Sequence, residues 1–134
     1  MRLPDWKTRL IGYVSDAARR PFQLGVHDCA LFSAGAVLAM TGIDYAADWR
    51  GRYTTLTGGL RVLRKAGYAD HIDLAARHFD EVHPAFADLG DLAVVPTPDG
   101  DILGVVQGEM IYGLDNDGIA YTPRVRAVRA FRVT

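Results

Sequence analysis

One pair of neighbouring residues in this sequence could support nucleophilic chemistry: Asp28 and Cys29, the only cysteine of the chain. The apolar segment from Ala30 to Met40 follows at once, so Cys29 is predicted to lie in the first turn of a buried helix. A helix N-terminus carries partial positive charge and unpaired N–H groups, which favour a thiolate over a thiol. The pattern therefore indicates a candidate nucleophile, which would need a base and a group that orients the base.

Four histidines are available as that base, and none of them is placed by spacing alone: His27, His71, His78 and His83. His27 precedes Cys29 by two residues, and side chains that close at the start of a helix usually point apart. The other three fall in or beside a short predicted helix or in a loop before Pro84. The alternative is structural, because an unpaired cysteine is often simply a small buried apolar residue.

The elements that must position these residues change in type along the chain. Helical spacing and stop signals predict helices from about residue 4 to before Arg19, from Cys29 to about Thr41, from Leu56 to about Ala66 and over 70–77. Asp28 is the expected N-cap of the second helix and Gly42 its expected stop. Turn-forming sequences then separate predicted strands at 91–95, 102–107, 109–114, 118–122 and 127–133. Helices followed by short antiparallel strands indicate an α+β fold.

Length and composition limit the classes of function. At 134 residues, 49% of them apolar, the chain is expected to form one domain, residues 1–134, with its own core. It contains no apolar run long enough to span a bilayer and no signal-peptide core at its start. One cysteine cannot build a disulfide or a thiolate zinc site within the chain, so we expect no metal and no cofactor.

Charge is unevenly distributed although the formal net charge is only -1. Residues 70–117 are strongly acidic with Arg77 as their single cation, whereas the tail carries arginines at 124, 126, 129 and 132 and no acid. Such asymmetry suits a protein that docks on others through complementary faces, although it is also common on solvated surfaces. The near-neutral charge argues against nucleic acid as the main partner.

Two segments resemble the NlpC/P60 cysteine peptidases: Gly25 to Phe32, which contains the Asp-Cys pair, and Leu89 to Val95, which contains a Gly-Asp-Leu sequence. The resemblance implies a papain-like fold in which a helical N-terminal half, with Cys29 on its central helix, packs on a five- or six-stranded antiparallel sheet. Enzymes of that family cleave peptidoglycan stem peptides, and some are components of phage tail tips. The resemblance makes Cys29 the nucleophile.

The same resemblance does not supply the catalytic partners. The strand that carries the family's histidine aligns through Gly104, which puts Ile102 where the histidine belongs. In the next strand, Tyr112 falls where a further polar residue of the family is expected. An isoleucine cannot accept a proton, so the pattern predicts a peptidase fold that has lost its catalytic histidine.

The order of motifs over residues 20–134 is also similar to that of phage and prophage proteins related to these peptidases. The shared segments include an Arg-Gly-x-Tyr sequence at Arg50 to Tyr53 and a basic, aromatic last strand around Phe131. This resemblance implies a structural or assembly component of a long-tailed phage tail tip, located in the virion, which docks on tail hub proteins. Arginine and tyrosine are enriched at protein interfaces, so the expected contact residues are Arg50, Arg52, Tyr53, Arg129 and Arg132.

Two alternatives remain open at the level of sequence. The chain could be an active cysteine hydrolase that helps the tail to breach peptidoglycan, with Cys29 as nucleophile and His27, the nearest histidine, as base. Cys29 could also lend a thiolate to a metal cluster shared with a partner chain. Neither alternative involves nucleic acid or membrane insertion.

Overall fold

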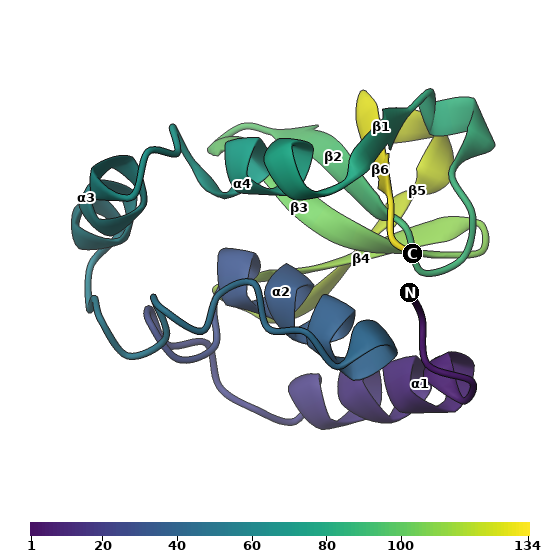
Figure 1. Ribbon diagram of the computed structural model, residues 1–134, viewed down its shortest axis with the longest axis horizontal. Helices are drawn as coiled ribbons and strands as arrows, with labels where there is room; N and C mark the ends of the chain where they lie inside the picture. The colour runs from purple at the N-terminus through teal and green to yellow at the C-terminus, as the bar shows by residue number, and fades with distance from the viewer.

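The computed structural model describes all 134 residues and places four helices on a six-stranded antiparallel sheet (Figure 1). The helices are α1 (Trp6–Ala17), α2 (Cys29–Thr41), α3 (Leu56–Lys65) and α4 (His71–His78). The strands are β1 (Asp80–Val82), β2 (Leu92–Thr97), β3 (Gly100–Gln107), β4 (Met110–Asp115), β5 (Gly118–Pro123) and β6 (Arg129–Arg132). Two 3-10 turns, η1 (Pro84–Phe86) and η2 (Arg124–Arg126), complete the chain. The predicted α+β class and sheet are confirmed.

The sheet is an antiparallel meander that the last strand, β6, extends along the β2 edge. Its order is β1-β6-β2-β3-β4-β5, with every pair antiparallel. Strands β2 to β5 follow one another through tight turns, whereas β6 returns to lie between β1 and β2, where Phe131 is opposite Leu92. The short strand β1 was not predicted, because Asp80-Glu81-Val82 lacks the apolar alternation that signals a strand.

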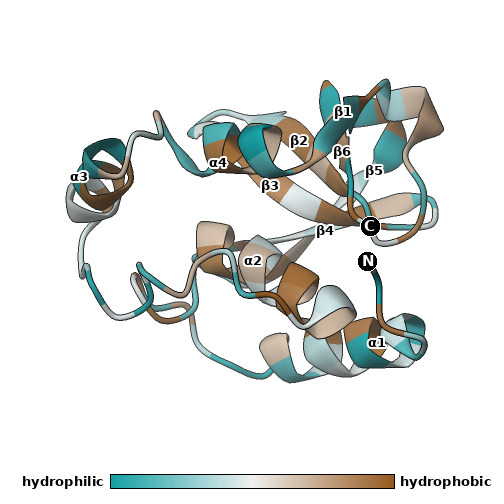
Figure 2. Ribbon diagram, viewed as in Figure 1, coloured by the Kyte–Doolittle hydropathy of each residue, from teal (hydrophilic) through white to brown (hydrophobic).

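Helix α2 lies between α1 and the sheet, as its apolar composition on nearly all sides predicts (Figures 1 and 2). One core cluster joins Phe32, Val37 and Met40 of α2 to Leu10 of α1 and to alternate residues of the sheet, which include Leu92, Val94, Leu103 and Val105. Gly35 permits close contact with α1, because a Cβ there would overlap the Tyr13 hydroxyl, which donates to the Phe32 carbonyl at 2.8 Å.

The opposite face of the sheet has its own smaller core. Ala93, Val95, Val106, Ile111 and Ala130 form it, and Ile102 packs against it. Successive residues of a strand point to opposite faces, so the alternation along β3 decides which side chains face α2. None of the four helices has the length and apolar character needed to cross a membrane.

Candidate functional site

Cys29 is the first residue of α2, as predicted, but its surroundings do not favour a thiolate. Its side chain is half-buried, and the pKa of the thiol is raised, first by burial and then by the charge of Asp28. Hydrogen bonds from backbone N–H groups act in the opposite direction and are the weaker influence. The helix N-terminus favours the thiolate, but burial and the charge of Asp28 outweigh this effect. The Cys29 thiol is therefore protonated at neutral pH.

Asp28 organises the start of α2. It is 2% exposed, and its Oδ1 accepts from the Leu31 N–H at 2.9 Å as the N-cap of the helix. Its Oδ2 accepts from the Gly25 N–H at 2.9 Å and from the Tyr53 hydroxyl at 2.6 Å. Burial and the bond to Asp28 raise the pKa of Tyr53, which therefore remains a protonated donor.

The Arg50–Tyr53 segment is anchored on the loop before α2. The Gly51 N–H donates to the Gly25 carbonyl at 2.7 Å. Gly25 has a φ of +83°, and a Cβ there would collide with the Tyr53 carbonyl oxygen, so only glycine fits. Together with the Tyr53–Asp28 bond, these contacts make the segment a brace for α2.

Three of the four histidines are committed to other contacts. His27 is buried with its Nε2 3.1 Å from the Ala17 carbonyl, and burial lowers its pKa. His83 accepts from the Ala85 N–H through Nδ1 and so caps η1. His78 lies 3.2 Å from the Tyr68 hydroxyl, and its ring contacts the Tyr45 ring at a tilt of 47°. Because its Nε2 contacts the Ala17 carbonyl, His27 is not placed to act as the base for Cys29, the role that its proximity in sequence suggested.

His71 lines the cavity beside α2, as His78 does. This cavity, about 50 Å³ in volume, is lined by residues of α2, α4, the central strands and the 45–53 loop, among them Ala30, Ser33 and Tyr53. The His71 Nε2 is buried and has no hydrogen-bond partner. Helical periodicity could have found it, because positions 71, 74, 75 and 78 form one face of α4 and all four line the cavity.

The position that the resemblance assigns to the catalytic histidine does not face α2. Its neighbour Leu103 packs in the α2 core and accepts from the Ser33 hydroxyl, whereas Ile102 packs on the opposite face of the sheet. Tyr112 lies on the α2 side and its ring contacts Tyr121 edge-on. No group of three or more His, Cys, Asp or Glu side chains lies close enough to hold a metal ion.

The expected contact residues are mostly occupied by internal bonds. Arg50 pairs with Asp44 through two hydrogen bonds, and Arg129 pairs with Glu81 in the same bidentate way. Arg132 donates to Asp91 and to the Phe86 carbonyl. Of the five, Arg52 alone is exposed and has a side chain without a hydrogen bond or ion pair.

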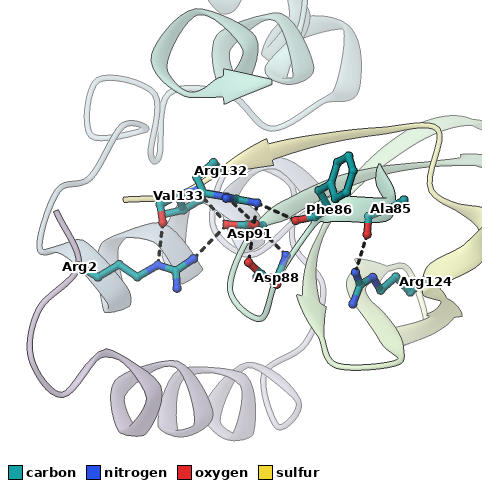
Figure 3. Close-up of polar contacts among 8 residues, drawn as sticks. All are labelled: Arg2, Ala85, Phe86, Asp88, Asp91, Arg124, Arg132 and Val133. Carbon is teal, nitrogen blue, oxygen red and sulfur yellow. Dashed lines mark hydrogen bonds and ion pairs between the residues drawn. The ribbon is translucent and has the colours of Figure 1, made fainter. Parts of the chain in front are cut away.

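Asp91, which the sequence analysis placed in the Gly-Asp-Leu segment without a role, is the most heavily bonded carboxylate of the molecule (Figure 3). It is fully buried, and Arg2 and Arg132 donate to it at 3.0 and 3.2 Å. Backbone N–H groups of Val133 and Asp88 donate at 3.1 and 2.9 Å. Arg2 also donates to the Val133 carbonyl, so Asp91 ties the first residues of the chain to the last.

A second feature that sequence reasoning missed is an exposed apolar and basic surface, which we call the η1–η2 patch and define as Phe86, Arg124, Val125, Arg126 and Val128. Arg124 donates to the Ala85 carbonyl at 3.3 Å and so holds the two turns together (Figure 3). Phe86 is 71% exposed and Val125 93%. Neither Arg124 nor Arg126 is paired with an acid.

Comparison with known proteins gives a family and a fold. The family described as "Domain of unknown function (DUF6950)" matches residues 1–133. No curated protein is similar enough to count as a relative. Among solved structures, the NlpC/p60 domain of the peptidoglycan hydrolase SagA is similar with a TM-score of 0.55, covers 93% of this chain and 97% of its own, and is 12% identical. The expected NlpC/P60-like fold is thus confirmed.

Proposed function

The chain belongs to the DUF6950 family, and on that premise we propose that it is a non-catalytic protein on a peptidase-like scaffold, a structural component of a long-tailed phage or prophage tail tip that docks on tail hub proteins. The support for the tail-tip setting is the order of sequence motifs over residues 20–134. The support for the loss of catalysis is the geometry around Cys29.

One observation carries the non-catalytic part: the thiol of Cys29 has neither a base nor an environment that ionises it. Burial and Asp28 raise its pKa. The resemblance assigns the family's histidine to Ile102, which is apolar and lies on the far face of the sheet, and its neighbour Leu103, which faces α2, is apolar too. A nucleophilic cysteine needs the reverse of both conditions.

The η1–η2 patch is the surface best suited to docking. Large exposed apolar side chains on a surface held by hydrogen bonds are typical of interaction sites. Its two cations, Arg124 and Arg126, form no ion pair within the chain, so an acidic and partly apolar partner surface complements it. Arg52 is a further candidate contact.

The test is complementation in the phage or prophage that encodes the chain. Cys29→Ala should support tail assembly as well as the parent does, while the double variant Val125→Asp/Arg126→Glu should lose assembly and lose binding to the purified hub protein. Arg61→Glu is the matched control, because Arg61 is exposed on α3 and makes no ion pair. Normal assembly with the patch variant would overturn the docking surface, and tails complete without the chain would overturn the structural role.

A second function, cell-wall hydrolysis by Cys29, is favoured by one observation, the unpartnered Nε2 of His71 beside the start of α2. In this reading His71 replaces His27 as the base. Cys29 does not itself line the cavity, so its side chain would have to turn toward His71. Release of peptides from purified peptidoglycan by the parent, and not by Cys29→Ala, would establish this function over the first.

A further inference from the structure

The cavity beside α2 has the composition of a binding site for a small, uncharged molecule. Fourteen of its 17 lining residues are hydrophobic, including Leu31 and Val37 of α2, Leu74 of α4 and Leu103 of β3. An apolar lining offers little to water, which needs two to four polar partners to be held. It does favour an aliphatic group of matching size.

One polar atom in that lining remains unsatisfied. Of the buried side-chain nitrogen and oxygen atoms of the chain, only His71 Nε2 and Gln107 Nε2 lack a hydrogen-bond partner, and only His71 lines this cavity. Several other polar groups of the lining have partners: Ser33 donates to the Leu103 carbonyl, Tyr53 donates to Asp28, and His78 lies 3.2 Å from the Tyr68 hydroxyl. A buried polar group without a partner is unfavourable, so a ligand that pairs with Nε2 would be stabilised there.

We propose that this cavity binds a short, branched aliphatic molecule whose single uncharged amide or hydroxyl group forms a hydrogen bond with His71 Nε2. The proposal does not depend on the docking role, because the cavity and the η1–η2 patch share no residue.

Size and charge define the ligand class further. The cavity, at about 50 Å³, has about a third of the ~150 Å³ that accommodates benzene in an apolar protein interior. By that proportion it encloses about two non-hydrogen atoms of the ligand and leaves the rest at its mouth. Burial lowers the pKa of His71, whose imidazole is therefore uncharged at neutral pH. A carboxylate would have to lose its hydration without meeting a cation, which disfavours acids of the same shape.

The experiment is a titration of the ¹⁵N-labelled full chain at pH 7 with isobutyramide and, separately, with isobutyrate as the charged isostere. We expect saturable shifts of the backbone signals of Ala30, Ser33 and Leu74 and of the His71 side-chain nitrogens, with isobutyramide binding in the millimolar range and isobutyrate at least about tenfold more weakly. A water molecule bound at Nε2, seen as an exchange contact that isobutyramide does not remove, would overturn the proposal.

Two variants separate binding at His71 from general effects. His71→Phe fills the cavity and removes the polar atom, and it should abolish the shifts while the chain remains folded by circular dichroism. His83→Phe is the matched control, because His83 caps η1 and does not line the cavity, and it should bind like the parent. Should His71→Phe not fold, His71→Gln, which keeps a donor and an acceptor, must still bind isobutyramide. Unchanged binding by His71→Phe, or shifts confined to other regions, would contradict the assignment.

Discussion

Two aspartates are buried in this molecule, and the chain holds them in opposite ways. Asp28 accepts only from uncharged donors, the Gly25 and Leu31 N–H groups and the Tyr53 hydroxyl. Asp91 accepts from two backbone N–H groups and from two guanidinium groups. The charge at Asp91 is therefore compensated by cations, whereas the charge at Asp28 has no cationic partner and acts on its neighbours.

The difference shows that a carboxylate next to a candidate nucleophile can oppose ionisation of its thiol. The Asp28 charge helps to keep the Cys29 thiol and the Tyr53 hydroxyl protonated. The same residue is an effective N-cap and braces the 50–53 segment. A carboxylate at this place thus strengthens the fold of the Cys29 region while it weakens the nucleophile.

The largest effect in this comparison is expected at Asp91. Asp91→Ala should lower the free energy of unfolding by about 3–5 kcal/mol, because it leaves two arginines and two N–H groups without their acceptor. Urea denaturation measures the change. Asp88→Ala is the control: its side chain is 76% exposed and only 3.8 Å from Arg132, so a loss of at most about 1 kcal/mol is expected. Similar losses of unfolding free energy in the two variants would show that the burial of Asp91 does not determine its contribution to stability.

Tyr53→Phe tests the uncharged arrangement around Asp28. Removal of the hydroxyl takes one of three donors from a buried carboxylate, which should cost about 1.5–3 kcal/mol of unfolding free energy. Tyr121→Phe, at a 59% exposed tyrosine without a hydrogen bond, should change it by less than about 0.5 kcal/mol. Equal values for both would mean that Tyr53 does not brace α2.

Asp28→Asn tests how the charge of Asp28, which has no cationic partner, acts on Cys29. The amide keeps the shape and can still cap α2 through its oxygen, but it removes the charge and turns an NH2 group toward the Gly25 N–H in place of the Oδ2 acceptor. We therefore expect a cost of about 1–3 kcal/mol in stability. Because the Asp28 charge raises the pKa of Cys29 after burial does, the pH midpoint of iodoacetamide labelling should move lower than in the parent. A midpoint that stays or rises would show that burial alone protects the thiol.

The smallest effect is expected at an exposed ion pair, Glu81 with Arg129, in which the hydrogen bond from Arg129 holds the pKa of Glu81 below its usual value. A depressed carboxyl pKa stabilises the fold above the unfolded value and ceases to do so as pH falls through the folded value. Glu81→Gln should therefore cost about 0.2–1 kcal/mol at pH 7 and nothing once Glu81 is protonated. Thermal unfolding at both pH values gives the difference, and a cost that persists in acid would point to packing instead.

Local signals allowed much of the fold to be predicted. Asp28 and Gly42 delimit α2 as expected, since Asp28 caps the helix and Gly42 ends it in a left-handed conformation. The meander was predicted from its turn residues, with strand ends that differ by one or two residues on average. The position of β6 between β1 and β2 could not be predicted, because pairing between distant strands depends on the whole core.

The candidate site was predictable only in part. The place of Cys29 at a helix start follows from the apolar run after it, but the direction of its pKa depends on burial, which neighbouring sequence does not report. His71 could have been assigned to a buried face by helical spacing, whereas its missing partner depends on α2 and on the 45–53 loop. Phe86 and Val125 resemble core residues by type, and only the fold exposes them.

The bonds at Asp91 also constrain when the chain can fold during its synthesis. Three of their four donors come from residues 2, 132 and 133, and the two ends of the chain lie side by side in Figure 1. Strand β6 also supplies the pairing between β1 and β2. A ribosome must therefore release residues 129–133 from its exit tunnel before the sheet can close, so a nascent chain halted earlier should remain open and sensitive to protease.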